Sequence, residues 1–141
     1  MTGAELSLTP GVEAIRLFLH VLAAAIWVGG QFVMLGLVGT ARGLGDEAPK
    51  KLARAFARLS WPAFAVLVIT GFWNLAALNP HGHATTGWNM VMGIKFLLVI
   101  LAGLGAWLHG RASTKGGTAA WGSIAGTASL LALLAGILLA G

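Results

Sequence analysis

Two basic side chains lie inside long apolar runs of this 141-residue sequence, where an ionisable group is costly and is a candidate for function. His20 follows Ile15 by five residues, and Lys95 follows Met90 by five residues. At 1.5 Å per residue, each side chain lies about 8 Å inside its run. An imidazole nitrogen can bind a transition metal or a haem iron, and an ammonium group can bind an anion. If both runs enter a membrane from the same side, these groups lie at the same depth.

Helical spacing adds other side chains to His20. Trp27, Gln31 and Met34 follow it at +7, +11 and +14, which is within about 40° of one face of a straight α-helix. This stripe holds the notable polar and soft side chains of its run. It predicts either one wall of an internal site, or a face on which His20 and Gln31 only tie helices together by hydrogen bonds.

Lys95 has a stripe of its own, which includes Trp88, Met92 and His109. Facing the His20 stripe, it would complete an internal cofactor site with Trp27, Gln31, Lys95 and His109 as contacts. The alternative is that Lys95 extends outward to the lipid headgroups and that His109 anchors the helix at the membrane surface.

A second cluster of possible metal ligands lies between the two stripes in sequence. His81 and His83 flank a glycine, and Met90 and Met92 follow. Imidazole nitrogen and thioether sulfur suit copper, whereas Mg²⁺, Ca²⁺ and Mn²⁺ prefer oxygen ligands. We therefore expect a copper site whose ligands come from His20, His81, His83, Met34, Met90 and Met92.

Composition sets the environment of these residues. The chain is 57% hydrophobic and only 9% charged, whereas soluble domains carry about 25% charged residues. With no cysteine, there is no disulfide, thiolate metal site or cysteine nucleophile. No motif of a hydrolase or nucleotide-binding enzyme is present, and no apolar run holds a carboxylate for a proton relay. The sequence therefore predicts a membrane protein with few chemical groups.

Four apolar runs are long enough to cross a bilayer, which needs about 20 residues. They span residues 15–38, 59–78, 90–108 and 119–140. Their short connections predict that residues 1–141 form a single domain, an all-α integral membrane protein built as an antiparallel up-and-down bundle of four helices. Thr9-Pro10 marks the entry into the first run, Asp46 and Pro49 an extension of the second, and Pro62 is expected near the start of the second run.

The loops differ sharply in charge. The first and third connections hold seven of the nine basic residues, namely Arg42, Lys50, Lys51, Arg54, Arg58, Arg111 and Lys115, and the second connection, residues 79–89, holds none. By the positive-inside rule, both termini and the second loop face outward. We expect a bacterial inner membrane with the second loop in the periplasm. The net charge of +5 then reports orientation and anionic lipid, not nucleic acid.

The fourth run is rich in small residues at spacings of four, which let helices approach closely in a bilayer. Gly122 and Gly126 form one pair, and Ala128, Ala132 and Gly136 continue a second row. The rows predict close packing within the bundle or, alternatively, a homodimer interface.

The motif at residues 19–30, LHVLAAAIWVGG, resembles the first helix of the copper resistance protein D (CopD) family, and residues 93–98, GIKFLL, are similar to its third helix. The resemblance implies an inner-membrane domain that binds or moves copper, with His20, Trp27 and Lys95 at the motif positions. A more distant likeness to the small bacterial membrane protoporphyrinogen oxidases implies haem b or a porphyrin near His20.

Three functions follow as hypotheses. The first is copper binding or translocation, from the outward-facing histidines and methionines to His20 and Met34. The second is a haem b redox protein with His20 as axial ligand, Lys95 or Arg16 near the propionates, and Trp27 and Trp88 beside the ring. The third is an assembly subunit with structural histidines. A binding protein is favoured over an enzyme, and an enzyme would be a haem-dependent oxidoreductase.

Overall fold

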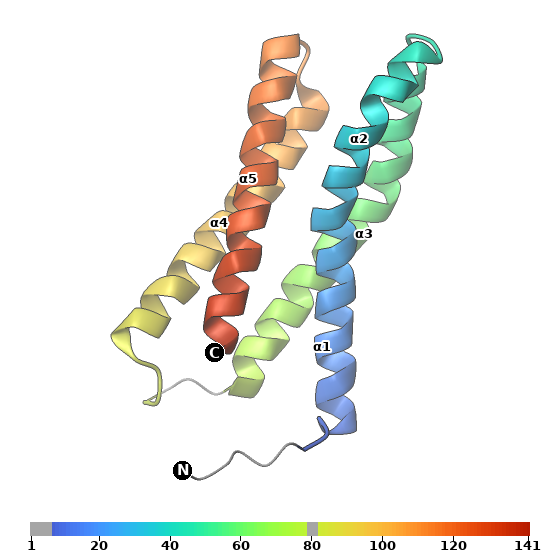
Figure 1. Cartoon of the computed structure of the whole chain (residues 1–141). Helices are drawn as coiled ribbons and strands as arrows, with labels where there is room; N and C mark the ends of the chain where they lie inside the picture. The colour runs from blue at the N-terminus through green and yellow to red at the C-terminus, as the bar shows by residue number, and fades with distance from the viewer. Residues whose placement is uncertain (1–6, 79–81) are drawn as a thin grey trace.

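The computed structural model describes residues 7–78 and 82–141, and every regular element within them is helical. The elements are α1 (Gly11–Ala24), the π-helix η1 (Ala25–Gly29), α2 (Gly30–Gly43), α3 (Ala48–Leu78), α4 (Thr86–Arg111) and α5 (Lys115–Ala140). Because α1, η1 and α2 follow one another without a break, the chain forms four long helices (Figure 1).

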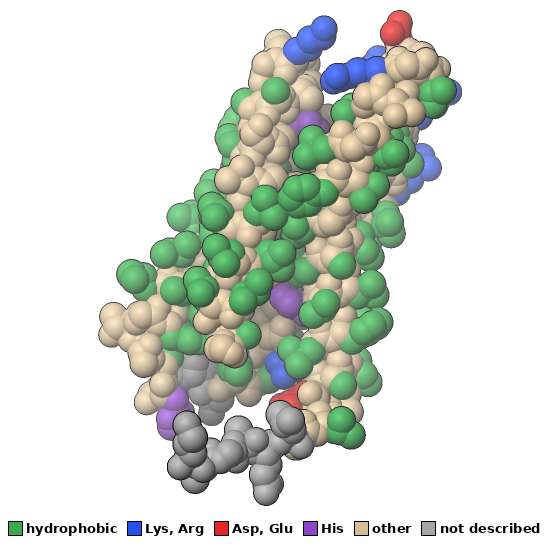
Figure 2. All heavy atoms as spheres, viewed as in Figure 1, with side chains coloured by type: hydrophobic (Ala, Val, Ile, Leu, Met, Phe, Trp, Pro, Cys, Tyr) green, Lys and Arg blue, Asp and Glu red, His purple; other side chains and the backbone are tan. Residues whose placement is uncertain are grey.

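All four long helices are long and apolar enough to cross a membrane. They extend over Gly11–Gly43, Ala48–Leu78, Thr86–Arg111 and Lys115–Ala140. Large apolar side chains cover their outward surfaces, which a bilayer would solvate (Figure 2). The prediction of an all-helical membrane protein with four spans is therefore confirmed, and each helix is longer than the apolar run that predicted it.

Local signals explain where the helices begin. Pro10 directly precedes α1, as the Thr9-Pro10 pair predicted. The Thr85 and Thr114 hydroxyls accept backbone N–H groups in the first turns of α4 and α5, from Trp88 and Gly117. These caps satisfy donors that a helix start leaves without partners.

The α3 helix differs from the sequence prediction at Pro62. It begins at Ala48, so Pro62 lies inside the helix and not near its start. The basic residues from Lys50 to Arg58 had been expected to form a helical extension, and the extension is continuous with the apolar span. A proline inside a membrane helix is tolerated because neighbouring groups compensate for the backbone hydrogen bond that it removes.

The helices pack as two hairpins (Figure 1). In one, α3 lies alongside α1, η1 and α2, and in the other α4 packs against α5 over most of its length. The most extensive contact between the two hairpins joins η1 to α5. Lys and Arg side chains gather at the end of the molecule where α2 leads into α3 and α4 into α5 (Figure 2).

Small residues bring α4 and α5 together. A Cβ atom at Gly105 would lie 3.0 Å from the backbone nitrogen of Ala125, so no larger residue fits there. On α5, Ala128 and Ala132 are buried together with Ala125. The small-residue rows predicted from the sequence thus serve packing within the chain.

Candidate functional site

His20 is half-buried and forms a hydrogen bond with α3. Its Nδ1 is 2.8 Å from the Thr70 hydroxyl oxygen. That hydroxyl has only one proton, which it donates to the Val66 carbonyl at 2.6 Å. This pattern favours a neutral imidazole whose Nδ1–H donates to Thr70 and whose Nε2 keeps a lone pair. This is the tautomer in which a histidine can bind a metal through Nε2.

Arg16 lies one helical turn before His20 and is only 6% exposed. Its guanidinium donates to the Asn74 side-chain oxygen at 2.8 Å and lies 3.9 Å from the carboxylate of Glu13. The sequence predicts Arg16 only as a residue near the propionates of a possible haem, and it does not single out Asn74. The Asn74 and Glu13 contacts fix the position of the Arg16 guanidinium, whose remaining N–H groups can donate to an anionic group.

A sequence signal for this arrangement exists. Arg16 and His20 are four residues apart on one helix, and Thr70 and Asn74 are four residues apart on the next. Matching spacings of four on two successive helices place both pairs on facing stripes. Two side-chain hydrogen bonds between α1 and α3 result, one from Arg16 to Asn74 and one from His20 to Thr70.

Lys95 is predicted from the sequence to lie at the same depth as His20. Its half-buried side chain reaches α5, where a Cβ atom at Gly136 would lie 3.2 Å from Nζ. Gly71 lies beside His20, and a Cβ there would be 3.6 Å from Cε1. Glycines thus leave room around both groups.

Trp27 and Gln31 form a different site, at the contact between the hairpins. The Trp27 indole N–H donates to the Ser129 hydroxyl at 3.0 Å, and the Gln31 amide donates to the same oxygen at 3.3 Å. Trp27 also packs on Trp61 and Phe64, with ring centroids 5.6 and 4.4 Å away. This polar contact within an aromatic cluster ties α5 to η1.

Ser129→Ala is expected to destabilise the protein by about 1–2 kcal/mol. The substitution leaves the buried Trp27 N–H without its acceptor, whereas the Gln31 amide retains the Trp27 carbonyl at 3.0 Å. Reversible unfolding in mixed detergent micelles measures the change. Ser123→Ala is the matched control, because the exposed Ser123 hydroxyl donates only to its own helix at the Ala119 carbonyl. Equal stability of both variants would contradict this assignment.

The predicted single stripe from His20 to Met34 is wrong. That stripe assumed a straight α-helix, but η1 intervenes and changes the rotation per residue. His20 contacts α3, Gln31 contacts α5, and Met34 lines an apolar groove between α2 and α3. Fourteen residues also separate Met34 from His20 by about 21 Å along the axis, too far to share a metal ion.

His109 lies near the α4–α5 connection, away from the hydrogen bonds that Arg16 and His20 form with α3. Its Nδ1–H donates to the Thr118 carbonyl at 2.7 Å, and its ring fills the space over Gly122, where a Cβ would lie 2.9 Å from Nδ1. Nearby, the Arg111 guanidinium lies 4.3 Å from the Trp107 ring centre. The geometry fits the anchoring role that the sequence left open.

The structure describes three of the four residues of the predicted outer metal cluster, namely His83, Met90 and Met92. His81 lies outside the described residues, while His83 and Met90 are exposed and Met92 is half-buried. His83 and Trp88 line a cavity of about 250 Å³ near the end of α5. Within residues 7–78 and 82–141, no three His, Asp or Glu side chains come together to hold a metal ion.

Comparison with known proteins gives no match: no protein-family model, curated protein or solved structure is significantly similar to this chain. The function is therefore argued from the residues around His20.

Proposed function

We propose that this chain is a membrane redox protein that binds haem b, with His20 as an axial ligand through Nε2. The observation that carries the proposal is the hydrogen bond from His20 Nδ1 to Thr70, whose own proton goes to Val66. A histidine that binds a metal usually donates its other N–H to a fixed acceptor, which sets the tautomer and the ring orientation.

The charges around His20 favour haem over a copper ion. Arg16 is buried one turn before His20, and the sequence predicts Lys95 at the same depth. Two cations would repel Cu⁺ or Cu²⁺, but they would stabilise the propionate carboxylates of a haem. The donor set therefore fits a ligand that combines a metal centre with negative charges.

Each residue has a defined role in this proposal. His20 would hold the iron, Thr70 would orient the imidazole, and Arg16 and Lys95 would bind the propionates. Bound haem would supply one-electron iron chemistry. The cavities next to Met34 and His83 do not include His20, so binding would require the hairpins to part around it. The main contact between the two hairpins is at η1. The hairpins would therefore separate around the hydrogen bond between Trp27 and Ser129, which would stay in place.

The proposed topology is an antiparallel up-and-down bundle in a bacterial inner membrane, with both termini and the second loop in the periplasm. Its support is the distribution of basic residues, which gather beside the other two loops. In this orientation His20 and Lys95 lie in the outer half of the membrane.

Copper binding at His20 and at the outer histidines and methionines is the competing proposal. Its support is the set of nitrogen and sulfur donors in the sequence and the resemblance to the copper resistance protein D family. A homodimer that joins two His20 side chains on one haem is a further form of the haem proposal. The absorption spectrum and metal content of the purified protein distinguish copper from haem, and the haem-to-chain ratio distinguishes the dimer.

Thr70→Val is expected to weaken haem binding by about tenfold to 100-fold while the fold is retained. Valine has the same shape as threonine but cannot accept the His20 Nδ1–H, so the ring loses its orientation. Titration of purified protein with haem measures the affinity, and the reduction potential of the bound haem should also shift. Ser60→Ala on the same helix is the control, since the Ser60 hydroxyl bonds only its own helix. Unchanged affinity and potential in Thr70→Val would contradict the role of Thr70.

A further inference from the structure

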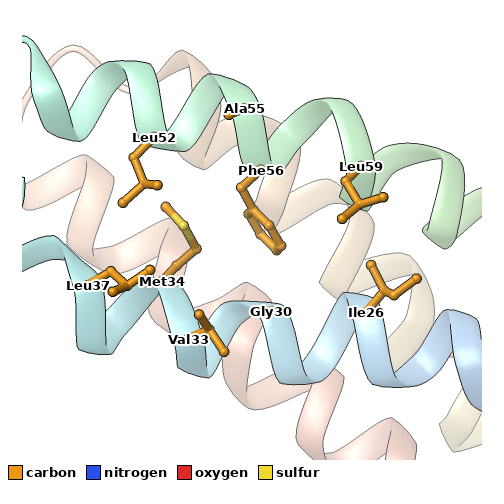
Figure 3. Close-up of a pocket in the computed structure, with 9 residues that line it drawn as sticks. All are labelled: Ile26, Gly30, Val33, Met34, Leu37, Leu52, Ala55, Phe56 and Leu59. Carbon is orange, nitrogen blue, oxygen red and sulfur yellow. The ribbon is translucent and has the colours of Figure 1, made fainter.

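An apolar groove of about 400 Å³ lies between α2 and α3, remote from the contacts of His20 with α3. Ile26 and Leu59 lie at one end, and Leu37 and Leu52 lie at the end nearer the α2–α3 connection (Figure 3). The Phe56 ring and the Met34 side chain point into the space between the helices (Figure 3). Every residue that lines the groove is apolar or glycine.

The length and place of the groove match one leaflet of a bilayer. From Ile26 to Leu37 the helix rises about 17 Å, close to half of the 30 Å hydrocarbon thickness. The groove lies between two of the membrane-spanning helices. In a membrane, the molecules that meet such a groove are lipid acyl chains.

Basic side chains stand beside the groove along α3. Lys51, Arg54 and Arg58 each directly precede a residue that lines it, namely Leu52, Ala55 and Leu59. All three are exposed. The neighbouring Lys50 is paired with Glu47 at 2.9 Å, but among the described residues no carboxylate lies within 4.0 Å of these three. This edge of the groove therefore carries positive charge that a negative group would complement.

Glu47 does not cancel this charge, since it is already engaged. Its hydrogen bond and ion pair with Lys50 hold the pKa of the Glu47 carboxyl below its usual value. The charge of Arg54 contributes more weakly to this lowering. Since neither Lys51 nor Arg54 has a carboxylate within 4.0 Å among the described residues, both can bind an external anion.

We propose that this groove binds one acyl chain of an anionic phospholipid, with the headgroup phosphate held by Lys51 and Arg54. Apolar burial supplies binding to any phospholipid, and the two basic side chains supply the preference for a negative headgroup. The site is separate from His20 and does not depend on haem or copper.

Native mass spectrometry of the detergent-purified chain tests the proposal. The probe is an equimolar mixture of phosphatidylglycerol and phosphatidylcholine with identical acyl chains. We expect phosphatidylglycerol to bind at least tenfold more than phosphatidylcholine, since each basic side chain near a headgroup contributes about fivefold. Equal binding of the two lipids to the unaltered protein would overturn the proposal.

Two variants separate the acyl and headgroup contributions. Ala55→Phe fills the groove and should reduce the binding of both lipids at least fivefold, whereas Ala53→Phe, exposed on another face of α3, should not. The double change Lys51→Gln and Arg54→Gln should remove the preference for phosphatidylglycerol and leave the binding of phosphatidylcholine unchanged. Circular dichroism and gel filtration confirm that each variant is folded. Equal loss in Ala55→Phe and Ala53→Phe, or a preference that survives the double change, would contradict the site.

Discussion

His20→Ala is expected to raise the dissociation constant for haem at least 100-fold. The substitution removes the only imidazole that the Thr70 hydroxyl holds in the tautomer with a free Nε2. Loss of a direct ligand should exceed the 10- to 100-fold effect that is typical for a residue supporting a ligand. Titration of the haem-depleted protein, followed by the Soret absorbance, measures the constant.

His109→Ala is the matched control for this prediction. His109 donates to the Thr118 carbonyl close to the α4–α5 connection and has no contact with Thr70 or Arg16 among the described residues. Its removal should leave the haem affinity within twofold of the original. If His20→Ala binds haem as tightly as His109→Ala does, His20 is not the ligand.

Gly105→Leu is expected to reduce the free energy of unfolding by about 3 kcal/mol or more. A Cβ atom at position 105 alone would lie 3.0 Å from the Ala125 nitrogen and 3.2 Å from its Cα. These are backbone atoms of α5, so the new side chain can be placed only if the two helices move apart. Reversible unfolding in mixed micelles measures the change.

Gly93→Leu tests whether this effect comes from packing or from the loss of a glycine. Gly93 is on the same helix, and a Cβ atom there would meet nothing within 4 Å. Leucine is favoured over glycine in a helix, so this variant should be as stable as the original or more so. A destabilisation of equal size at both positions would contradict the proposed role of the Gly105 contact.

The helical membrane fold could be predicted from composition and from the length of the apolar runs. Few charges and four runs of about 20 apolar residues predict membrane-spanning helices, because a backbone in lipid must satisfy its own hydrogen bonds. The prediction for Pro62 failed because hydropathy marks where a helix enters the membrane and not where it begins. The basic turns from Lys50 to Arg58 continue α3 beyond the apolar run.

The candidate site could be predicted only in part. His20 and Lys95 were found because an ionisable side chain in an apolar run is unusual, and the structure places the Lys95 side chain against Gly136 of α5. Gln31 does not share the α3 contact of His20 because the π-helix η1 changes the rotation after Ala24, and no simple residue pattern marks that change. Asn74 and Ser129 were missed because short polar side chains are common in membrane helices and become informative only through their partners.

The absorption spectrum and copper content of the protein purified in detergent from haem-replete cells test the central claim most directly. The account predicts a Soret band that is retained through purification, is absent from His20→Ala, and is accompanied by no stoichiometric copper. A colourless, folded protein that carries copper would contradict it.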